Sequence, residues 1–190
     1  MCGETKDFWI IATLGQITDG GYLLLVPKRH VECIGAMTSK EAKLLDKLGV
    51  RVCDALIQEY GGAPDLIMFE HDIVGQTIKH AHLHMLLGNY IIAQKILSDF
   101  PNSKLDSIVS LNDFRSNLYS SKKKPYLLWQ DAHGMKVCWN PPAPLQYLRI
   151  IVADALGRPE RANWRNMDPE LDKKLWQETV KRLKPYFTSK

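Results

Sequence analysis

The sequence predicts an α+β protein with an antiparallel sheet, and three observations lead to this class. Two apolar runs rich in strand formers, residues 8–15 and 21–29, flank the turn-like ITDGG at 17–21. A helix with a capping box follows at 38–60. In a later run, residues 76–87, histidines alternate with apolar residues, which is typical of a strand with one buried face.

The first two runs predict a β-hairpin, because glycine tolerates a positive φ and aspartate bonds its own backbone in the intervening turn. In the helix, Thr38 and Glu41 make the T-x-x-E capping box. Apolar residues then recur at helical spacing until the glycine pair at 61–62 ends the helix. A helix of this length can cover one face of the sheet.

The next segments predict two further strands. Pro64 opens a strand at 65–70, a loop follows at 71–75, and the histidine run forms the next strand. Residues 89–97 are apolar, with a pattern that fits either a strand or a helix.

The second half of the chain predicts a hairpin and two helices. A breaker, NPPAP, separates the hairpin from the helices. The expected elements are a short amphipathic element at 105–114, the hairpin at 120–139 with its turn at 131–134, a helix at 145–156 ended by Gly157, and a last helix begun by Asp168 and Pro169.

Size and composition predict a protein with a substantial core. The chain has 190 residues, of which 45% are hydrophobic and 24% charged, which suits one ordinary domain with an appendage. No apolar run approaches the roughly 20 residues of a membrane span, and no signal peptide is evident, so we expect a cytoplasmic protein without a membrane partner. The four cysteines are widely spaced, and we expect reduced thiols, mostly buried.

Charge is unevenly spread along the chain. Residues 1–100 carry 9 Lys and Arg against 12 Asp and Glu, whereas residues 101–190 carry 16 against 9. The basic second half suits an anionic ligand or nucleic acid, or forms a solvated face.

Three histidines, His80, His82 and His84, stand at every second position. In a strand they share one face, at a spacing of roughly 6–7 Å per step. Three interpretations follow: polar residues on an outward face, a metal site, or nucleophilic catalysis. Three of the six histidines within five residues are unusual for an ordinary polar face.

A tetrahedral metal site fits the histidine row poorly, because the two outer imidazoles lie too far apart, so we expect no bound metal. A neutral imidazole can instead attack phosphorus and form a covalent phosphoramidate. Gly75, Gln76 and Thr77 stand just before the row, where small residues let backbone amides approach a phosphate. The pattern therefore favours nucleophilic catalysis.

The segment GQTIKHAHLHMLL (75–87) resembles the motif of the histidine-triad (HIT) family, in which histidines and apolar residues alternate. Residues 22–48 are similar to a second block of that family: a strand ending in proline, a basic residue, a histidine and a capped helix. The resemblance covers about residues 8–88. It implies a HIT-like antiparallel sheet in a catalytic core at 1–100, with an extension packed on it at 101–190.

The resemblance also implies a mechanism. His82 would be the nucleophile that forms a nucleotidyl-histidine, with the carbonyl of His80 accepting from its ring and the His80 ring bracing the strand. His84 would bond the α-phosphate or the bridging oxygen. Gln76 and Thr77 would hold the phosphate and the leaving group. Family members are usually homodimers.

The chain departs from the family pattern at three places. Many members have Asn or Gln about thirteen residues before the nucleophile, where this chain has Phe69. His71 could replace that contact if its loop is flexible, or it is a surface histidine. The first strand lacks the acidic residue that binds ribose in many members, and no cysteine pair suggests structural zinc.

The predicted function is therefore a nucleotide hydrolase or nucleotidyl transferase that cleaves at the α-phosphate. The covalent mechanism requires no cofactor, although nucleotide substrates often arrive with Mg²⁺. Two alternatives remain open: an enzyme that removes adenylate from a nucleic-acid 5′ end, and a nucleotide-binding regulator without turnover.

Overall fold

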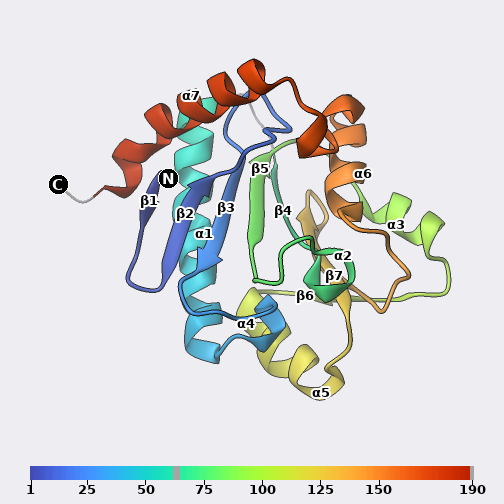
Figure 1. Ribbon diagram of the computed structural model, residues 1–190. Helices are drawn as coiled ribbons and strands as arrows, with labels where there is room; N and C mark the ends of the chain where they lie inside the picture. The colour runs from blue at the N-terminus through green and yellow to red at the C-terminus, as the bar shows by residue number, and fades with distance from the viewer. Residues whose placement is uncertain (62–64, 189–190) are drawn as a thin grey trace.

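The computed structural model describes residues 1–61 and 65–188, and its strands form one open antiparallel sheet (Figure 1). The strand order is β1-β2-β3-β5-β4-β7-β8-β6. The strands are β1 (Gly3–Glu4), β2 (Phe8–Ala12), β3 (Leu23–Pro27), β4 (Leu66–Glu70), β5 (Leu83–Leu87), β6 (Lys104–Ile108), β7 (Tyr126–Asp131) and β8 (Gly134–Trp139). The predicted α+β class with an antiparallel sheet is confirmed.

Helices and short helical turns complete the fold. The α-helices are α1 (Ser39–Tyr60), α2 (Asp72–Gly75), α3 (Ala93–Asp99), α4 (Leu111–Asp113), α5 (Ser120–Lys122), α6 (Tyr147–Ala155) and α7 (Pro169–Phe187). Phe114–Tyr119 form a π-helical segment between α4 and α5, and 3₁₀ turns occupy Ile34–Ala36, Pro159–Arg161 and Trp164–Asn166.

Both halves of the chain contribute to the sheet. The predicted hairpin of β2 and β3 is present, with Ile10 opposite Leu25. The predicted second hairpin, β7 and β8, is also present, and β7 pairs with β4, so that Phe69 lies opposite Trp129. The second half therefore continues the sheet of the first half, and no break in strand pairing separates them.

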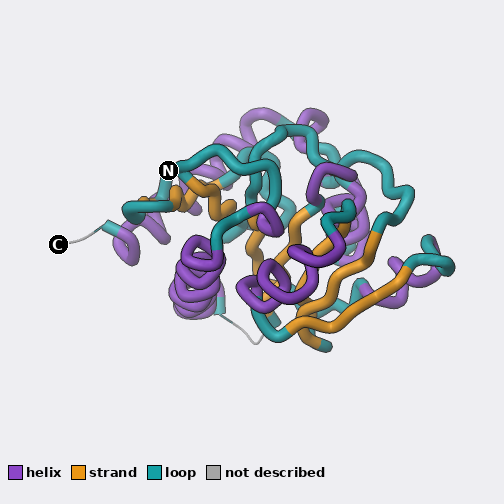
Figure 2. Tube along the Cα trace, turned by 90° about the horizontal axis from the view of Figure 1, so that it is seen from below, coloured by secondary structure: helices purple, strands orange, loops and turns teal. Residues whose placement is uncertain are grey.

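Helices cover both faces of the sheet, as the view along its lower edge shows (Figure 2). On one face α1, the π-helical segment and the end of α7 pack over side chains such as Leu25, Leu83 and Met85. On the other face α3 and α6 pack over Phe69 and Leu86. These two layers give successive residues of β5 different surroundings, and His84 lies on the α6 side with Phe69.

Helix α1 begins where its capping box predicts. The Thr38 side chain accepts from the Glu41 backbone N–H, and the Glu41 side chain accepts from the Thr38 backbone N–H. Arg29 pairs with the same carboxylate and, mainly through this hydrogen bond, lowers the pKa of Glu41 to about 2. The first turn of α1 is thereby tied to the segment that follows β3.

We expect Thr38→Ala to lower the free energy of unfolding by about 1 kcal/mol, because the first turn of α1 loses an N-cap acceptor. Urea unfolding of the variant beside the wild-type protein measures this effect. Thr38→Ser keeps the hydroxyl and serves as the matched control, and an equal loss in both variants would mean that the cap is not the cause.

The second-half helices also begin as the sequence predicts. The Asp168 side chain accepts from the Leu171 N–H at 2.8 Å, with Pro169 in the first turn of α7. Helix α6 ends just before Gly157, whose φ is +65°. Free thiols are found at all four cysteines, three of them buried, which confirms the prediction. No helix in the described ranges is long and apolar enough to cross a membrane.

Several predicted elements differ in the structure. Residues 71–75, predicted as a loop, contain α2, and the ambiguous run 89–97 contributes to α3. The element predicted at 105–114 divides between β6 and α4. The predicted roles of Gly62 and Pro64 fall outside the described residues.

The strand predicted at 76–87 begins only at Leu83, so His80 and His82 precede it. The cause is Pro27 on the neighbouring strand, which ends β3 and has no N–H to continue the ladder. The Pro27 carbonyl instead accepts from the His80 ring at 2.8 Å. The backbone N–H of Ala81 turns to the Val31 carbonyl at 2.7 Å.

Candidate active site

His82 and His84 lie at the start of β5, and the His84 ring is on the side of the sheet that α6 covers. His84 lies opposite Leu24 of β3 and Phe69 of β4. The His82 and His84 ring centroids are 4.8 Å apart, edge to face. The histidine row thus lies between a packed interior, at His84, and the half-buried surface at His82 and His80.

The tautomer of His82 is set by its own backbone neighbourhood. Its Nδ1 lies 2.7 Å from the His80 carbonyl oxygen. Since a carbonyl only accepts, Nδ1 carries the hydrogen and Nε2 keeps a free lone pair. Burial lowers the pKa of His82 below 6.5 despite this hydrogen bond. The ring is therefore neutral at neutral pH and has one nucleophilic nitrogen.

The His80 ring braces the segment, as expected from the sequence. Its Nε2 donates to the Pro27 carbonyl at 2.8 Å, and its ring meets His30 edge to face, with centroids 5.1 Å apart. His30 in turn donates to the Lys79 carbonyl at 2.8 Å. These contacts hold the peptide whose carbonyl orients His82.

His84 is the most enclosed of the three motif histidines, with only 7% of its surface exposed. Its ring stacks on Phe69 at a centroid distance of 4.3 Å and an interplanar angle of 9°. The Nδ1 atom lies 2.5 Å from the Tyr22 hydroxyl, whereas Nε2 is buried without a hydrogen-bond partner among the described residues. Burial is the largest cause that holds the pKa of His84 well below 6.5, and the charge of Arg149 acts in the same direction.

His71 is buried, so the interpretation of it as a surface histidine is wrong, while its role as a substrate contact stays a prediction. It is 4% exposed and meets Phe69 and His84 edge to face at 5.5 and 5.6 Å. Its Nε2 accepts from the Arg149 backbone N–H at 3.3 Å. Burial is the largest cause that lowers the pKa of His71 to about 3. His71 therefore supports His84 from behind, because helix α2 and α6 enclose it.

The residues before the histidine row occupy three different environments. Gly75 is buried, its carbonyl accepts from the Gln146 N–H at 2.9 Å, and a Cβ there would lie 3.0 Å from the His71 ring. The Gln76 Nε2 donates to the Glu32 carbonyl at 2.7 Å, and its Oε1 is buried without a partner among the described residues. Thr77 is exposed. Gly75 thus packs against His71, Gln76 keeps one polar atom without a partner among the described residues, and Thr77 faces solvent.

Two residues of the site were missed at the sequence level. Tyr22, at the start of the second apolar run, is completely buried against His84. Arg149 of α6 is 4% exposed, and its guanidinium donates to the carbonyls of Gly15, Arg161 and Ala162. The available signal was a charged residue between the apolar Leu148 and Ile151 of a predicted helix.

A buried carboxylate lies beside His71. Glu70 accepts from the Ile34 N–H at 2.8 Å and from the Tyr126 hydroxyl, and is completely buried. Burial and the neighbouring Asp72 raise the pKa of Glu70 to about 8. The carboxyl group therefore holds its proton near neutral pH while it joins β4 to the 3₁₀ turn after β3.

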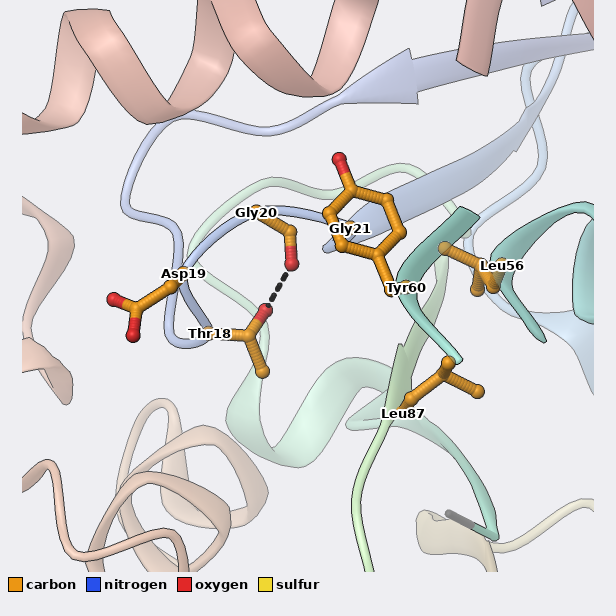
Figure 3. A pocket seen from close by; sticks show the side chains of 7 residues that line it. All are labelled: Thr18, Asp19, Gly20, Gly21, Leu56, Tyr60 and Leu87. Atoms are coloured by element: carbon orange, nitrogen blue, oxygen red, sulfur yellow. Dashed lines mark hydrogen bonds between the residues drawn. The ribbon is translucent and has the colours of Figure 1, made fainter. Parts of the chain in front are cut away.

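No cluster of three or more His, Cys, Asp or Glu side chains in the described part of the chain has the arrangement of a metal site. A hollow of about 240 Å³ lies near Leu87, at the opposite end of β5 from His82 (Figure 3). The Tyr60 ring stands over Gly21 there, and Thr18 bonds the Gly20 carbonyl at 2.8 Å. None of the predicted site residues lines this hollow.

No protein-family model matches this chain, and a comparison with curated proteins also finds no match.

The neutral buried histidines predict a pH-dependent stability. An unfolded histidine titrates near pH 6.5, whereas folded His71 titrates near pH 3, so acid below pH 6.5 favours the unfolded chain. Each such histidine lowers the free energy of unfolding by about 1.4 kcal/mol for every pH unit below 6.5. Above pH 6.5 it has no effect on this free energy. We expect the free energy of unfolding of His71→Gln, relative to that of the wild-type protein, to rise by about 2 kcal/mol as the pH is lowered from 7 to 5.

Urea unfolding at several pH values measures this gain. The difference between variant and wild-type protein isolates His71 from all other groups, and glutamine retains an acceptor for the Arg149 N–H. A difference that stays constant from pH 7 to pH 5 would show that folded His71 titrates normally.

Proposed function

We propose that this chain is a nucleotide hydrolase or nucleotidyl transferase that cleaves at the α-phosphate through a covalent intermediate on His82. The observation that supports this most is the pairing of His82 Nδ1 with the His80 carbonyl, which leaves Nε2 as a lone-pair nucleophile. The resemblance of residues 75–87 to the histidine-triad motif supports the same chemistry.

The reaction proceeds in two displacements. In the first, His82 Nε2 attacks the α-phosphorus; the N–P bond forms, and the bond to the leaving group breaks, with the electron pair departing on that group. The imidazole becomes a cation, whose Nδ1–H the His80 carbonyl continues to hold. In the second, water or another acceptor attacks phosphorus, the N–P bond breaks, and neutral His82 is restored as the acceptor's proton leaves to solvent.

The surroundings suit a phosphoryl group. The His84 ring centroid lies 4.8 Å from that of His82, and its buried Nε2 has no hydrogen-bond partner among the described residues. Gln76, whose Oε1 has no partner among the described residues, and the exposed Thr77 precede the row, next to Gly75, whose carbonyl accepts from the Gln146 N–H. These residues are assigned to the phosphate and the leaving group. No cofactor is required by the covalent route, and Mg²⁺ would arrive with the nucleotide.

A second candidate is an enzyme that removes adenylate from a nucleic-acid 5′ end. The excess of 16 basic over 9 acidic residues in 101–190 favours it. Homodimer formation and a cytoplasmic location, both expected from the sequence, belong to the same proposal; light scattering and cell fractionation test them.

The test is turnover of a mixed panel in chelator, read by mass spectrometry. The panel holds dinucleoside polyphosphates, adenosine phosphoramidate, nucleotide sugars and 5′-adenylylated DNA. Release of a nucleoside monophosphate supports the proposal, and the preferred substrate separates the two candidates. Tight nucleotide binding in calorimetry without any product would indicate a regulator and contradict the enzymatic proposal.

A further inference from the structure

We propose that Tyr22, with Arg149 beside it, is a positioning residue that fixes His84 in the tautomer whose hydrogen sits on Nε2. This inference rests on the proposed function for its catalytic meaning, although the tautomer itself is a property of the protein without substrate. Neither residue belongs to the histidine motif, and Arg149 lies in the second half of the chain.

The first step concerns the charge state of His84. The ring is 7% exposed, stacked on Phe69 and close to the other rings. Burial and the nearby charge of Arg149 both oppose a positive charge there. A neutral imidazole has one N–H, which sits either on Nδ1 or on Nε2.

The second step places the hydrogen of the Tyr22 hydroxyl. The hydroxyl oxygen and His84 Nδ1 are 2.5 Å apart, so one of them donates to the other. If Nδ1 donated, the Tyr22 hydrogen would need another acceptor. In the described part of the chain, His84 Nδ1 is the one acceptor found for this hydroxyl hydrogen.

Arg149 decides between the two arrangements. Its guanidinium carbon lies 5.5 Å from the centroid of the Tyr22 ring, and a guanidinium has donors only. It cannot accept the hydroxyl hydrogen, and its hydrogen bond and charge oppose the effect of burial on the pKa of Tyr22. Tyr22 therefore donates to Nδ1, and the single ring hydrogen of His84 sits on Nε2.

The guanidinium is itself fixed from outside the motif. It donates to the Gly15 carbonyl at 2.7 Å and to the Arg161 carbonyl at 2.8 Å. The Arg149 backbone N–H is bonded to His71, which contacts the edge of His84. Helix α6 thus holds both the group beside Tyr22 and the ring behind His84.

The two neighbouring imidazoles then present opposite functions. His82 offers a lone pair on Nε2, while His84 offers a buried N–H on Nε2 that has no acceptor among the described residues. A buried donor without an acceptor is costly, and a phosphoryl oxygen would satisfy it. One ring attacks the phosphorus, and the other stabilises the oxygen on which charge develops.

The experiment is a long-range ¹H–¹⁵N correlation spectrum of the full chain without substrate, with ring nitrogens assigned by triple resonance. We expect the Nε2–H pattern for His84 in the wild-type protein; an Nδ1–H pattern would overturn the inference. This measurement needs no variant and no turnover. If it shows Nε2–H while the substrate panel shows no reaction, the proposed function fails and the tautomer assignment stands.

Tyr22→Phe tests the cause. Without its donor, Nδ1 of His84 should gain the hydrogen in part of the molecules, and kcat should fall on the order of tenfold to a hundredfold with little change in KM. Tyr147→Phe removes another tyrosine hydroxyl, one that donates to Asp99 at 2.8 Å, and should change neither readout. An unchanged His84 tautomer in folded Tyr22→Phe would overturn the role of Tyr22.

Discussion

His82→Asn is expected to reduce turnover by on the order of a thousandfold or more, because the covalent route loses its nucleophile. Asparagine is a conservative probe here. Its side-chain amide can donate to the His80 carbonyl, as Nδ1 does at 2.7 Å in the wild-type protein. The segment before β5 should therefore keep its shape, and the loss should appear in the chemical step.

The measurement is product release by wild-type and variant proteins on the best substrate of the panel, together with nucleotide binding by calorimetry. Binding should persist in the variant, since His84, Gln76 and Thr77 are unchanged. His133→Asn in the exposed turn between β7 and β8 is the matched control and should retain full turnover. Equal turnover by His82→Asn and wild-type protein would rule out a nucleophile at this position.

Local signals in the sequence predict much of the fold. The turn at 17–21, the capping box of α1 and the Asp168 N-cap each involve residues a few positions apart, and each is present. The histidine row is also local, because the bond from His82 to the His80 carbonyl spans two residues. Such short-range patterns can be recognised in the sequence without knowledge of the tertiary structure.

The support of the site is long-range and could not be predicted. Tyr22 meets His84 across 62 positions, and Arg149 meets His71 across 78. The burial of His71 depends on α6, which packs on a sheet face formed by residues of β4 and β7 such as Phe69 and Trp129. The start of β5 likewise depends on Pro27 of a neighbouring strand. The alternation of histidine and apolar residues alone therefore predicted a strand that was too long at its start.

Phe69 stands where many proteins with the histidine-triad motif have Asn or Gln, and in this structure it packs against His84. The ring lies 4.3 Å from His84, nearly parallel, and is completely buried. An amide at this position would meet the face of an imidazole within an apolar layer, where its polar atoms would need other partners. Phe69 therefore acts as packing for His84.

The second large expected effect is the pH dependence of stability caused by Glu70. Glu70 lowers the free energy of unfolding as the pH rises, whereas His71 lowers it as the pH falls. An unfolded carboxyl titrates near pH 4.5, whereas folded Glu70 titrates near pH 8. Between these values the folded chain holds a proton that the unfolded chain has lost, so the free energy of unfolding falls as pH rises. The contribution is fully present below pH 4.5 and lost by about pH 8.

Glu70→Gln removes this dependence. A glutamine resembles the protonated acid in size and in lacking charge, and its amide oxygen can accept from the Ile34 N–H as Glu70 does. As the pH is raised from 5 to 8, we expect the free energy of unfolding of the variant to rise by about 4 kcal/mol relative to that of the wild-type protein. The rise is about 1.4 kcal/mol per pH unit. Urea unfolding at pH 5, 6, 7 and 8 measures the gain, with the difference between the two proteins cancelling other titrations.

Glu41→Gln is the matched control, because the environment of that carboxylate is the reverse. Arg29 holds the pKa of Glu41 at about 2, so it is ionised in both folded and unfolded chains above pH 5. Its substitution should cost a constant amount from pH 5 to pH 8. A flat difference for Glu70→Gln as well would mean that Glu70 is ionised in the folded protein; the 3₁₀ turn after β3 would then be anchored by a buried charge rather than a neutral acid.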